Sequence, residues 1–163
     1  MKIRNATTED IASIIDLERT SASAAHWSEQ QYRKLFSAAA GGVQNLVLVA
    51  EAANSDPPLA SAASFMGFLV ARKISPEWEL ENIVVAPSAR RNGIGQQLLK
   101  ALLDAARQTK SQAILLEVRE SNAAARSFYE KAGFRPSGRR KGYYKAPVED
   151  AILYRCDLRE RFS

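Results

Sequence analysis

The stretch from Glu77 to Val118 constrains the fold more than any other part of the chain. A strand-like segment, Glu77–Ala86, stops at Pro87, and a short apolar run, Ile114–Val118, is typical of a central strand. Between them a glycine-containing turn leads into a segment with apolar residues at helical spacing, namely Ile94, Leu98, Leu99, Leu102 and Leu103. Two strands joined in this way run parallel, with a right-handed crossover. The sequence therefore predicts a β-α-β unit in the middle of a sheet.

Further elements are predicted on both sides of this unit. Strands are expected at residues 2–6, 44–52, 62–73, 134–145 and 150–158, with turn residues at 54–58. The predicted helix starts are Thr7 or Thr8, Ser28 with Gln31 as a capping box, and Ser121 or Asn122, and Gly133 is the predicted glycine after the last helix. The resulting order is β-α-α-β-β-β-α-β-α-β-β. We therefore expect one α/β domain over residues 1–163, an α+β-type mixed sheet with helices on both faces.

Composition excludes several classes of protein. The chain has 163 residues, of which 46% are hydrophobic, and its longest apolar runs are too short to span a bilayer. No secretory signal precedes the first predicted strand, so we expect a cytoplasmic protein with no membrane partner. Cys156 is the only cysteine, which excludes an intrachain disulfide and a cysteine-based metal cluster, and no metal is predicted. The net charge of +5 favours acidic partners such as nucleic acid or a phosphate-bearing cofactor, and fits a merely solvated basic surface equally well.

The segment Arg90–Gln96 lies between a predicted strand end and a predicted helix start. The first N–H groups of a helix have no internal partner, and the helix dipole favours negative charge there. The two glycines of the segment lack a Cβ atom, so a diphosphate can approach the main chain, and its two arginines add positive charge. The pattern is not a P-loop, and Leu98 stands where a dinucleotide fingerprint requires a third small residue. A basic turn without a ligand remains open at this point.

One carboxylate, Glu117, interrupts the apolar run of the second central strand. Such local inconsistencies are expected at functional sites, and a salt-bridged structural glutamate is the alternative. Partial burial would raise the pKa of Glu117 and make it a better base for an amine, which must lose a proton before it attacks. Asn122 and Tyr129 lie almost two helical turns apart and so on nearly the same helix face. From there Tyr129 could act as a general acid, or it could simply pack.

These motifs together resemble the GNAT superfamily of N-acetyltransferases. The pattern Arg90-x-x-Gly93-x-Gly95, after a strand ending Val84-Val85-Ala86-Pro87, is similar to the acetyl-CoA motif of that superfamily, and the order of elements is similar over nearly the whole chain. The resemblance implies that loop amides hold the cofactor pyrophosphate and that a bulged strand binds the pantetheine arm. The residues implied are Ile83, Val84 and Val85 for pantetheine, and Arg90, Arg91, Asn92, Gly93, Ile94, Gly95 and Gln96 for the pyrophosphate.

A narrower resemblance is to the bacterial enzymes that acetylate the N-terminal alanine of a ribosomal protein. It rests on Trp27-Ser28-Glu29, Leu116-Glu117-Val118-Arg119-x-Ser121-Asn122, Phe128-Tyr129-Glu130-Lys131-x-Gly133-Phe134 and Gly138-Arg139-Arg140-Lys141-Gly142-Tyr143-Tyr144, followed by Glu149-Asp150-Ala151. It implies direct acetyl transfer to a protein N-terminus, with Glu117 as general base, Tyr129 as general acid and Asn122 as a cofactor contact.

Contacts to the acceptor are less sharply indicated. The candidates are Trp27, Glu79, Tyr143 and Tyr144, of which the tyrosines belong to a basic hairpin that borders the peptide site in the family. Alternation places Glu79 and Glu81 on one strand face, where either could bind the amine or simply form an ion pair. A lone histidine such as His26 is more often a surface or packing residue than a ligand.

Other functions remain open on the sequence. A GNAT enzyme could acetylate a small-molecule amine or a lysine side chain. A non-enzymatic RNA- or ribosome-binding domain would show salt-sensitive RNA affinity, but Glu117, Asn122 and Tyr129 together argue against it. The expected partner is a protein or peptide N-terminus, with no stable nucleic-acid complex required. We expect a monomer or weak homodimer, in which Cys156 is a buried packing thiol.

Overall fold

A mixed sheet, seven-stranded in the part of the chain that the structure describes, forms the centre of the fold. The computed structural model describes residues 1–21, 24–37, 43–52 and 65–159, and orders the strands β1-β2-β3-β4-β5-β7-β6. They are β1 (Lys2–Asn5), β2 (Gln44–Glu51), β3 (Phe65–Ile74), β4 (Glu77–Val85), β5 (Ala113–Arg119), β6 (Arg135–Lys145) and β7 (Val148–Asp157). β4 and β5 pair in parallel and every other neighbouring pair is antiparallel. The predicted mixed sheet and its parallel central pair are confirmed.

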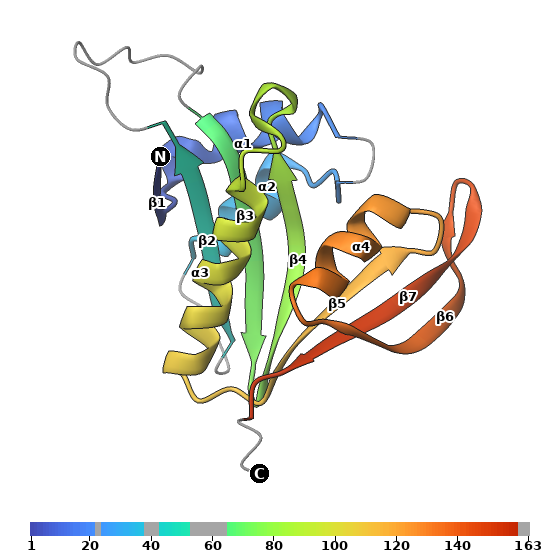
Figure 1. Ribbon diagram of the computed structural model, residues 1–163. Helices are drawn as coiled ribbons and strands as arrows, with labels where there is room; N and C mark the ends of the chain where they lie inside the picture. The colour runs from blue at the N-terminus through green and yellow to red at the C-terminus, as the bar shows by residue number, and fades with distance from the viewer. Residues whose placement is uncertain (22–23, 38–42, 53–64, 160–163) are drawn as a thin grey trace.

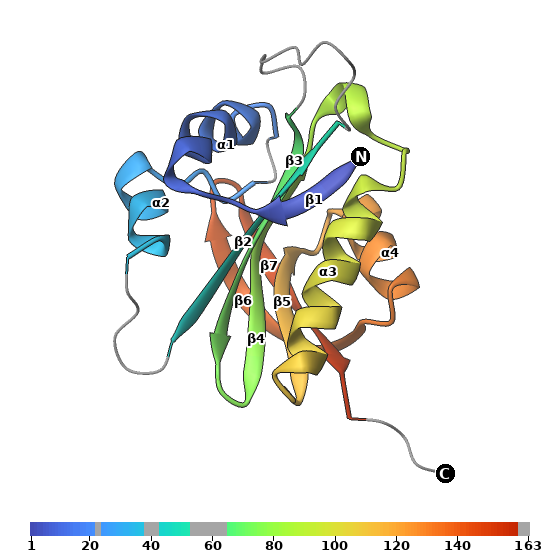
Figure 2. The ribbon, with the colours of Figure 1, turned by 90° about the vertical axis from the view of Figure 1, so that its left-hand side faces the viewer.

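Helices cover both faces of this sheet, as predicted. α1 (Ile11–Glu18) and α2 (Glu29–Leu35) lie on one face, and α3 (Ile94–Gln108) and α4 (Ala123–Lys131) on the other (Figure 2). The order of helices and strands along the chain is the one expected from the sequence. The predicted turn at 54–58 and the first residues of the strand predicted at 62–73 lie outside the described residues.

Local signals at the helix ends explain where the helices begin and stop. Ser28 and Gln31 form the predicted capping box, with the Ser28 N–H donating to Gln31 at 2.8 Å and the Gln31 N–H to Ser28 at 3.2 Å. The Asn122 side chain accepts the Ala125 N–H at 3.1 Å. Gly133 follows α4 with a φ of +99°, which a glycine adopts without strain.

The first helix starts later than predicted. Residues Thr8–Asp10 form a 3-10 turn, and the α-helical part begins only at Ile11. The Asp10 carboxylate accepts the Thr7 N–H at 2.8 Å and two bonds from Arg4 at 2.8 and 2.9 Å. These bonds hold the first turn tightly against β1.

Two apolar cores lie on the two faces. The larger packs α3 and α4 against the sheet and contains the predicted helix stripe, including Leu98, Leu99 and Leu102. It also buries Cys156, as expected. The smaller packs α1 and α2 onto β2, β3 and the end of β4.

β4 contributes side chains to both cores because it contains a bulge. Val70 of β3 pairs with Asn82, and the next residue, Ala71, pairs with Leu80. Glu81 is therefore the extra residue of β4, with no residue of β3 opposite it. Before the bulge, Leu80 packs in the core under α3. After it, Val84 packs under α1 and α2. Without the extra residue, Leu80 and Val84 would lie on the same face of the sheet. The bulge places them on opposite faces.

β4 and β5 stay together for only a short distance. Their pairing covers Glu77 with Ala113, Trp78 with Ile114 and Glu79 with Leu115. Beyond these pairs the strands separate, and β5, β7 and β6 carry α4 away from the rest of the sheet (Figure 1). Past the pair of Glu79 and Leu115, the backbone groups of β4 and β5 consequently form no ladder with each other.

Candidate active site

A cleft of about 1040 Å³ occupies the place where β4 and β5 separate. Residues of the α1–α2 connection, β4, β5, α4 and the β6–β7 hairpin line it. Eleven of the site residues predicted from the sequence are among them: Trp27, Glu79, Ile83, Val85, Arg90, Gly95, Glu117, Asn122, Tyr129, Tyr143 and Tyr144. The structure therefore brings together segments from nearly the whole length of the chain.

Six predicted cofactor residues do not line the cleft: Val84, Arg91, Asn92, Gly93, Ile94 and Gln96. The side chains of Val84 and Ile94 are buried in the two apolar cores, so only their backbone groups remain for a ligand. Arg91, Asn92 and Gln96 are exposed around the start of α3. Side chains at these five positions are therefore not part of the cleft wall, and Gly93 has none.

The start of α3 fits an anionic group. The Gln97 N–H bonds the Gly93 carbonyl at 3.0 Å, which leaves the N–H groups of residues 94–96 without a partner inside the helix. Gly93 has a φ of +74° and Arg91 a φ of +66°, so the loop turns sharply before the helix. A Cβ on Gly95 would lie 3.4 Å from the Phe128 ring. This glycine thus keeps α3 close to α4, and the free amides suit a diphosphate.

The edge of β4 beside the cleft offers further backbone groups. Ala86 donates its N–H to the Met66 carbonyl of β3 at 2.8 Å. Because bonding positions alternate along an antiparallel pair, the N–H of Val84 faces β3, and those of Ile83 and Val85 face away from it. They face the side from which β5 has departed. Of the three predicted pantetheine residues, Ile83 and Val85 thus present their amides to the cleft, and Val84 does not.

Glu117 lies on the side of β5 that faces away from α3 and α4. Its neighbours Leu116 and Val118 are buried in the core under those helices, and alternation turns Glu117 to the other face. Its side chain is 29% exposed, and its Oε1 lies 3.2 Å from the Arg140 Nε. The Tyr143 hydroxyl donates to Glu117, and this hydrogen bond raises the pKa of Tyr143. Glu117 is therefore a partly buried carboxylate that lines the cleft.

Tyr129 reaches the cleft from the opposite face. It belongs to the core under α4, where its ring packs against Phe134 with a centroid distance of 5.8 Å. Burial raises the pKa of the Tyr129 phenol, and the nearby Tyr144 adds to the effect. The phenol therefore carries its proton at neutral pH. Tyr129 both packs in the core and lines the cleft, so a packing role and a position for acid catalysis are compatible for this residue.

Comparison with known proteins identifies the family. The model of the Acetyltransferase (GNAT) family matches residues 11–134, from the first residue of α1 to the residue before β6. The chain belongs to this family. It is accordingly a GNAT N-acetyltransferase.

Two sequence relatives carry more specific names. A ribosomal protein bS18-alanine N-acetyltransferase of Haemophilus influenzae is 38% identical over 96 residues, which are 57% of this chain and 65% of that protein. The N-alpha-acetyltransferase RimI of Mycobacterium tuberculosis is 41% identical over 81 residues, 50% of this chain and 49% of that one. Each match thus spans less than two thirds of the relative's length.

A solved structure extends the likeness over the whole chain. The crystal structure of the ribosomal-protein-S18-alanine N-acetyltransferase from Escherichia coli is similar with a TM-score of 0.75 and 26% identity. The comparison covers 99% of this chain and 96% of that one. The likeness in fold is therefore not confined to the β-α-β unit at the centre of the sheet.

Several residues of the site escaped prediction. Arg72 of β3 pairs with both strand carboxylates, its Nε lying 3.0 Å from Glu81 and its Nη2 3.7 Å from Glu79. The expectation that Glu79 and Glu81 share a face is consistent with this common partner. Burial raises the pKa of Glu81, although Arg72 acts in the opposite direction. Arg72 lies opposite Glu79 in the antiparallel register of β3 and β4, and no local sequence pattern predicts that register.

A buried polar cluster supports the other wall of the cleft. The Glu18 carboxylate is 2% exposed and accepts bonds from the Tyr32 hydroxyl and, at 3.0 Å, from the Asn82 amide. Tyr32 also packs on Trp27, with a ring-centroid distance of 5.4 Å. The cluster thus joins α1, α2 and the part of β4 beside its bulge, under the α1–α2 connection that contains Trp27.

The described part of the chain lacks two classes of feature. Residues 1–21, 24–37, 43–52 and 65–159 contain no group of three or more His, Cys, Asp or Glu side chains placed to hold a metal ion. Within these same ranges, no helix is both long and apolar enough to cross a bilayer.

Proposed function

We propose that this GNAT enzyme transfers the acetyl group of acetyl-CoA to the N-terminal α-amine of a protein, with a ribosomal protein as the favoured acceptor. The observation that carries the proposal is the placement of Glu117 and Tyr129. One faces the α1–α2 side of the sheet and the other the α3–α4 side, yet both line the cleft opened by the separation of β4 and β5. A donor and an acceptor can therefore meet between them from opposite faces.

The residues present fit acetyl-CoA. The free N–H groups at the start of α3, together with Arg90, would hold the pyrophosphate, and the outward N–H groups of Ile83 and Val85 would bond the pantetheine arm. Asn122, at the start of α4, is a further cleft residue on this side. When bound, acetyl-CoA supplies an acetyl group activated as a thioester.

Glu117 and Tyr129 divide the proton transfers. Glu117 accepts the proton that the substrate amine loses, directly or through a water molecule. The new C–N bond then forms as the C–S bond breaks, and Tyr129 donates its proton to the departing sulfur. Cys156 takes no part because it is buried in the core under α3, where burial raises the pKa of its thiol. The transfer is therefore direct, without an acyl-enzyme.

A peptide acceptor suits the shape of the cleft. Its walls on the Glu117 side are Trp27 and His26 before α2, and Tyr143 and Tyr144 of the hairpin. Between them lies the sheet face that carries Leu115 and Leu153, which alternation places beside Glu117. An extended chain end can lie on this floor with its amine at Glu117. The names of the relatives from Haemophilus influenzae and Escherichia coli also support a ribosomal protein, which would be modified in the cytoplasm.

The proposal is tested by CoA release from acetyl-CoA with a panel of acceptors. The panel contains Ala-, Ser- and Met-initiated peptides, the same peptides blocked at the N-terminus and carrying a lysine, and polyamines. Turnover on free N-termini and its absence on blocked peptides is the expected result. Turnover confined to polyamines or blocked lysine peptides would replace the acceptor class, and the absence of any CoA release would overturn the enzymatic proposal.

A further inference from the structure

We propose that Asp150, with its partner Arg139, is a positioning residue that holds the hairpin wall of the acceptor site in its working shape. The inference rests on the proposed function. It begins with an irregularity in β6. Arg140 pairs with Ala151 of β7, and the next paired residue of β6 is Tyr144, which faces Glu149. Three residues of β6 therefore stand opposite Asp150 alone, and they form an enlarged β-bulge of the special type.

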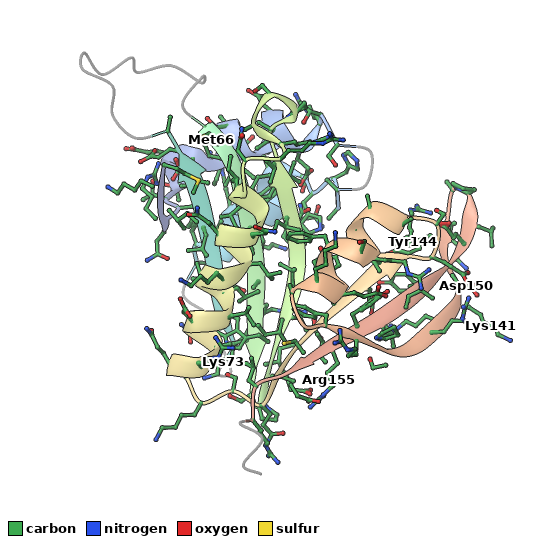
Figure 3. All side chains as sticks on the ribbon, viewed as in Figure 1. Met66, Lys73, Lys141, Tyr144, Asp150 and Arg155 are labelled. Carbon is green, nitrogen blue, oxygen red and sulfur yellow. The ribbon has the colours of Figure 1, made fainter. Side chains whose placement is uncertain are left out.

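Asp150 fills this bulge with both carboxylate oxygens. Oδ1 accepts the N–H of Gly142 at 2.8 Å, and Gly142 has a φ of +59°, a backbone conformation that favours glycine. Oδ2 accepts a bond from Arg139 Nη1 at 2.8 Å. The Gly142 bond and then the Arg139 guanidinium hold the pKa of Asp150 below its usual range, so it stays ionised at neutral pH. Figure 3 labels Asp150, with Lys141 of the bulge and Tyr144 just beyond it.

The same two residues also connect the hairpin to the end of β5. Arg139 Nη2 bonds Glu120 Oε1 at 2.8 Å, and the carbonyl of Asp150 accepts the Glu120 N–H at 3.1 Å. Glu120 directly follows Arg119, the last residue of β5, and lies two residues before Asn122. The bulge is thereby fixed relative to the strand that carries Glu117.

The residues that the bulge presents surround Glu117. Arg140, just before it, lies 3.2 Å from the Glu117 carboxylate, and Tyr143, within it, donates to the same carboxylate. Tyr144, just after it, stacks under the Arg119 guanidinium at 4.1 Å from the ring centroid. Loss of a bulge alters the register and so the direction of following side chains. The acceptor wall therefore depends on the hydrogen bonds of Asp150.

Global stability depends on them much less. The side chains of Asp150 and Arg139 are 27% and 43% exposed, and exposed ion pairs contribute little to the free energy of unfolding. Neither residue belongs to the apolar cores. A local role in acceptor binding thus predicts a kinetic signature that general destabilisation would not produce.

The test compares Asp150→Ala, Asp150→Asn and Arg139→Gln with a matched control, Asp104→Asn. Asp104 forms an exposed pair with Arg107 on α3, at 3.8 Å, so the control removes the same kind of charge elsewhere. For each variant, KM and kcat are measured with an Ala-initiated peptide, together with KM for acetyl-CoA and Tm. The amide of Asp150→Asn can still accept the Gly142 N–H, so this variant separates the backbone bond from the ion pair.

We expect Asp150→Ala to raise the peptide KM by about 10-fold or more, because the peptide must then order side chains that the bulge otherwise holds in place. Asp150→Asn and Arg139→Gln should raise it less, and the acetyl-CoA KM and Tm should match those of Asp104→Asn. An unchanged peptide KM in Asp150→Ala overturns the inference, and so does a parallel loss of Tm and of affinity for both substrates. A wild-type protein without peptide turnover would instead overturn the proposed function itself, and the inference with it.

Discussion

The Oε1 atom of Glu117 lies 3.2 Å from the Nε atom of Arg140, two strands away in the sheet. Glu117 comes from β5 and Arg140 from β6, just before its bulge, with β7 between the two strands. A cation of the protein thus lies beside the carboxylate that, in our proposal, receives the proton of the acceptor amine. An incoming ammonium group must compete with this guanidinium.

Arg140→Gln should therefore lower the KM for an Ala-initiated peptide. Arg140 is 57% and Glu117 29% exposed, and pairs near the surface contribute roughly 0.2–1 kcal/mol, so a decrease of about 1.5- to 5-fold is expected. The effect should shrink at high ionic strength because salt already weakens the pair. Steady-state kinetics at low and high salt measure both quantities. A higher KM in the variant would show that Arg140 binds the acceptor and does not compete with it.

Tyr129→Phe should reduce kcat by about 100-fold, the usual size for loss of a general acid. Since burial raises the pKa of Tyr129, its active, protonated form prevails below that raised pKa and is lost only above it. Wild-type kcat should consequently show no fall between pH 7 and about 10 that the variant lacks. The kcat–pH profiles of both proteins check this. An alkaline fall in wild type that disappears in Tyr129→Phe would contradict the assigned protonation state.

Tyr32→Phe tests the buried cluster under the Trp27 wall. The change leaves the Glu18 carboxylate with the Asn82 amide as its remaining partner in the cluster. Removing one partner of a buried charged group costs about 1–3 kcal/mol of unfolding free energy. Urea unfolding measures it, with Tyr143→Phe as the control, since Tyr143 is an exposed tyrosine whose change should cost less than about 0.5 kcal/mol. Equal stability of the two variants would show that the cluster is not a stabilising element.

Features encoded by neighbouring residues were predictable from the sequence. The stripe of leucines on α3, the Ser28–Gln31 capping box and the glycine after α4 each act within a few residues, and the structure contains all three. Glu117 was recognisable because a carboxylate in an apolar strand conflicts with its surroundings. The roles assigned to Glu117 and Tyr129 stay predictions, although both residues line the cleft.

Features that depend on pairing between distant strands were not predictable. The bulge at Glu81 exists only in register with β3, and it turns Val84 into the core under α1 and α2. Arg72 and Arg140 reach the cleft from strands whose register no local pattern encodes. The sequence alone suggests that Glu18, the last residue of a short helix, is exposed to solvent. Only the fold places its partners Tyr32 and Asn82 beside it.

The most direct test of the account is the kcat of Glu117→Gln with an Ala-initiated peptide at saturating acetyl-CoA. Glutamine keeps the size of the side chain but cannot accept the proton of the amine. We predict a decrease in kcat of about 100-fold or more with an unchanged Kd for acetyl-CoA, because the residues that we propose to bind the cofactor lie on other elements. A kcat within a few-fold of wild type would contradict the assignment of Glu117 as the general base, and with it the proposed mechanism.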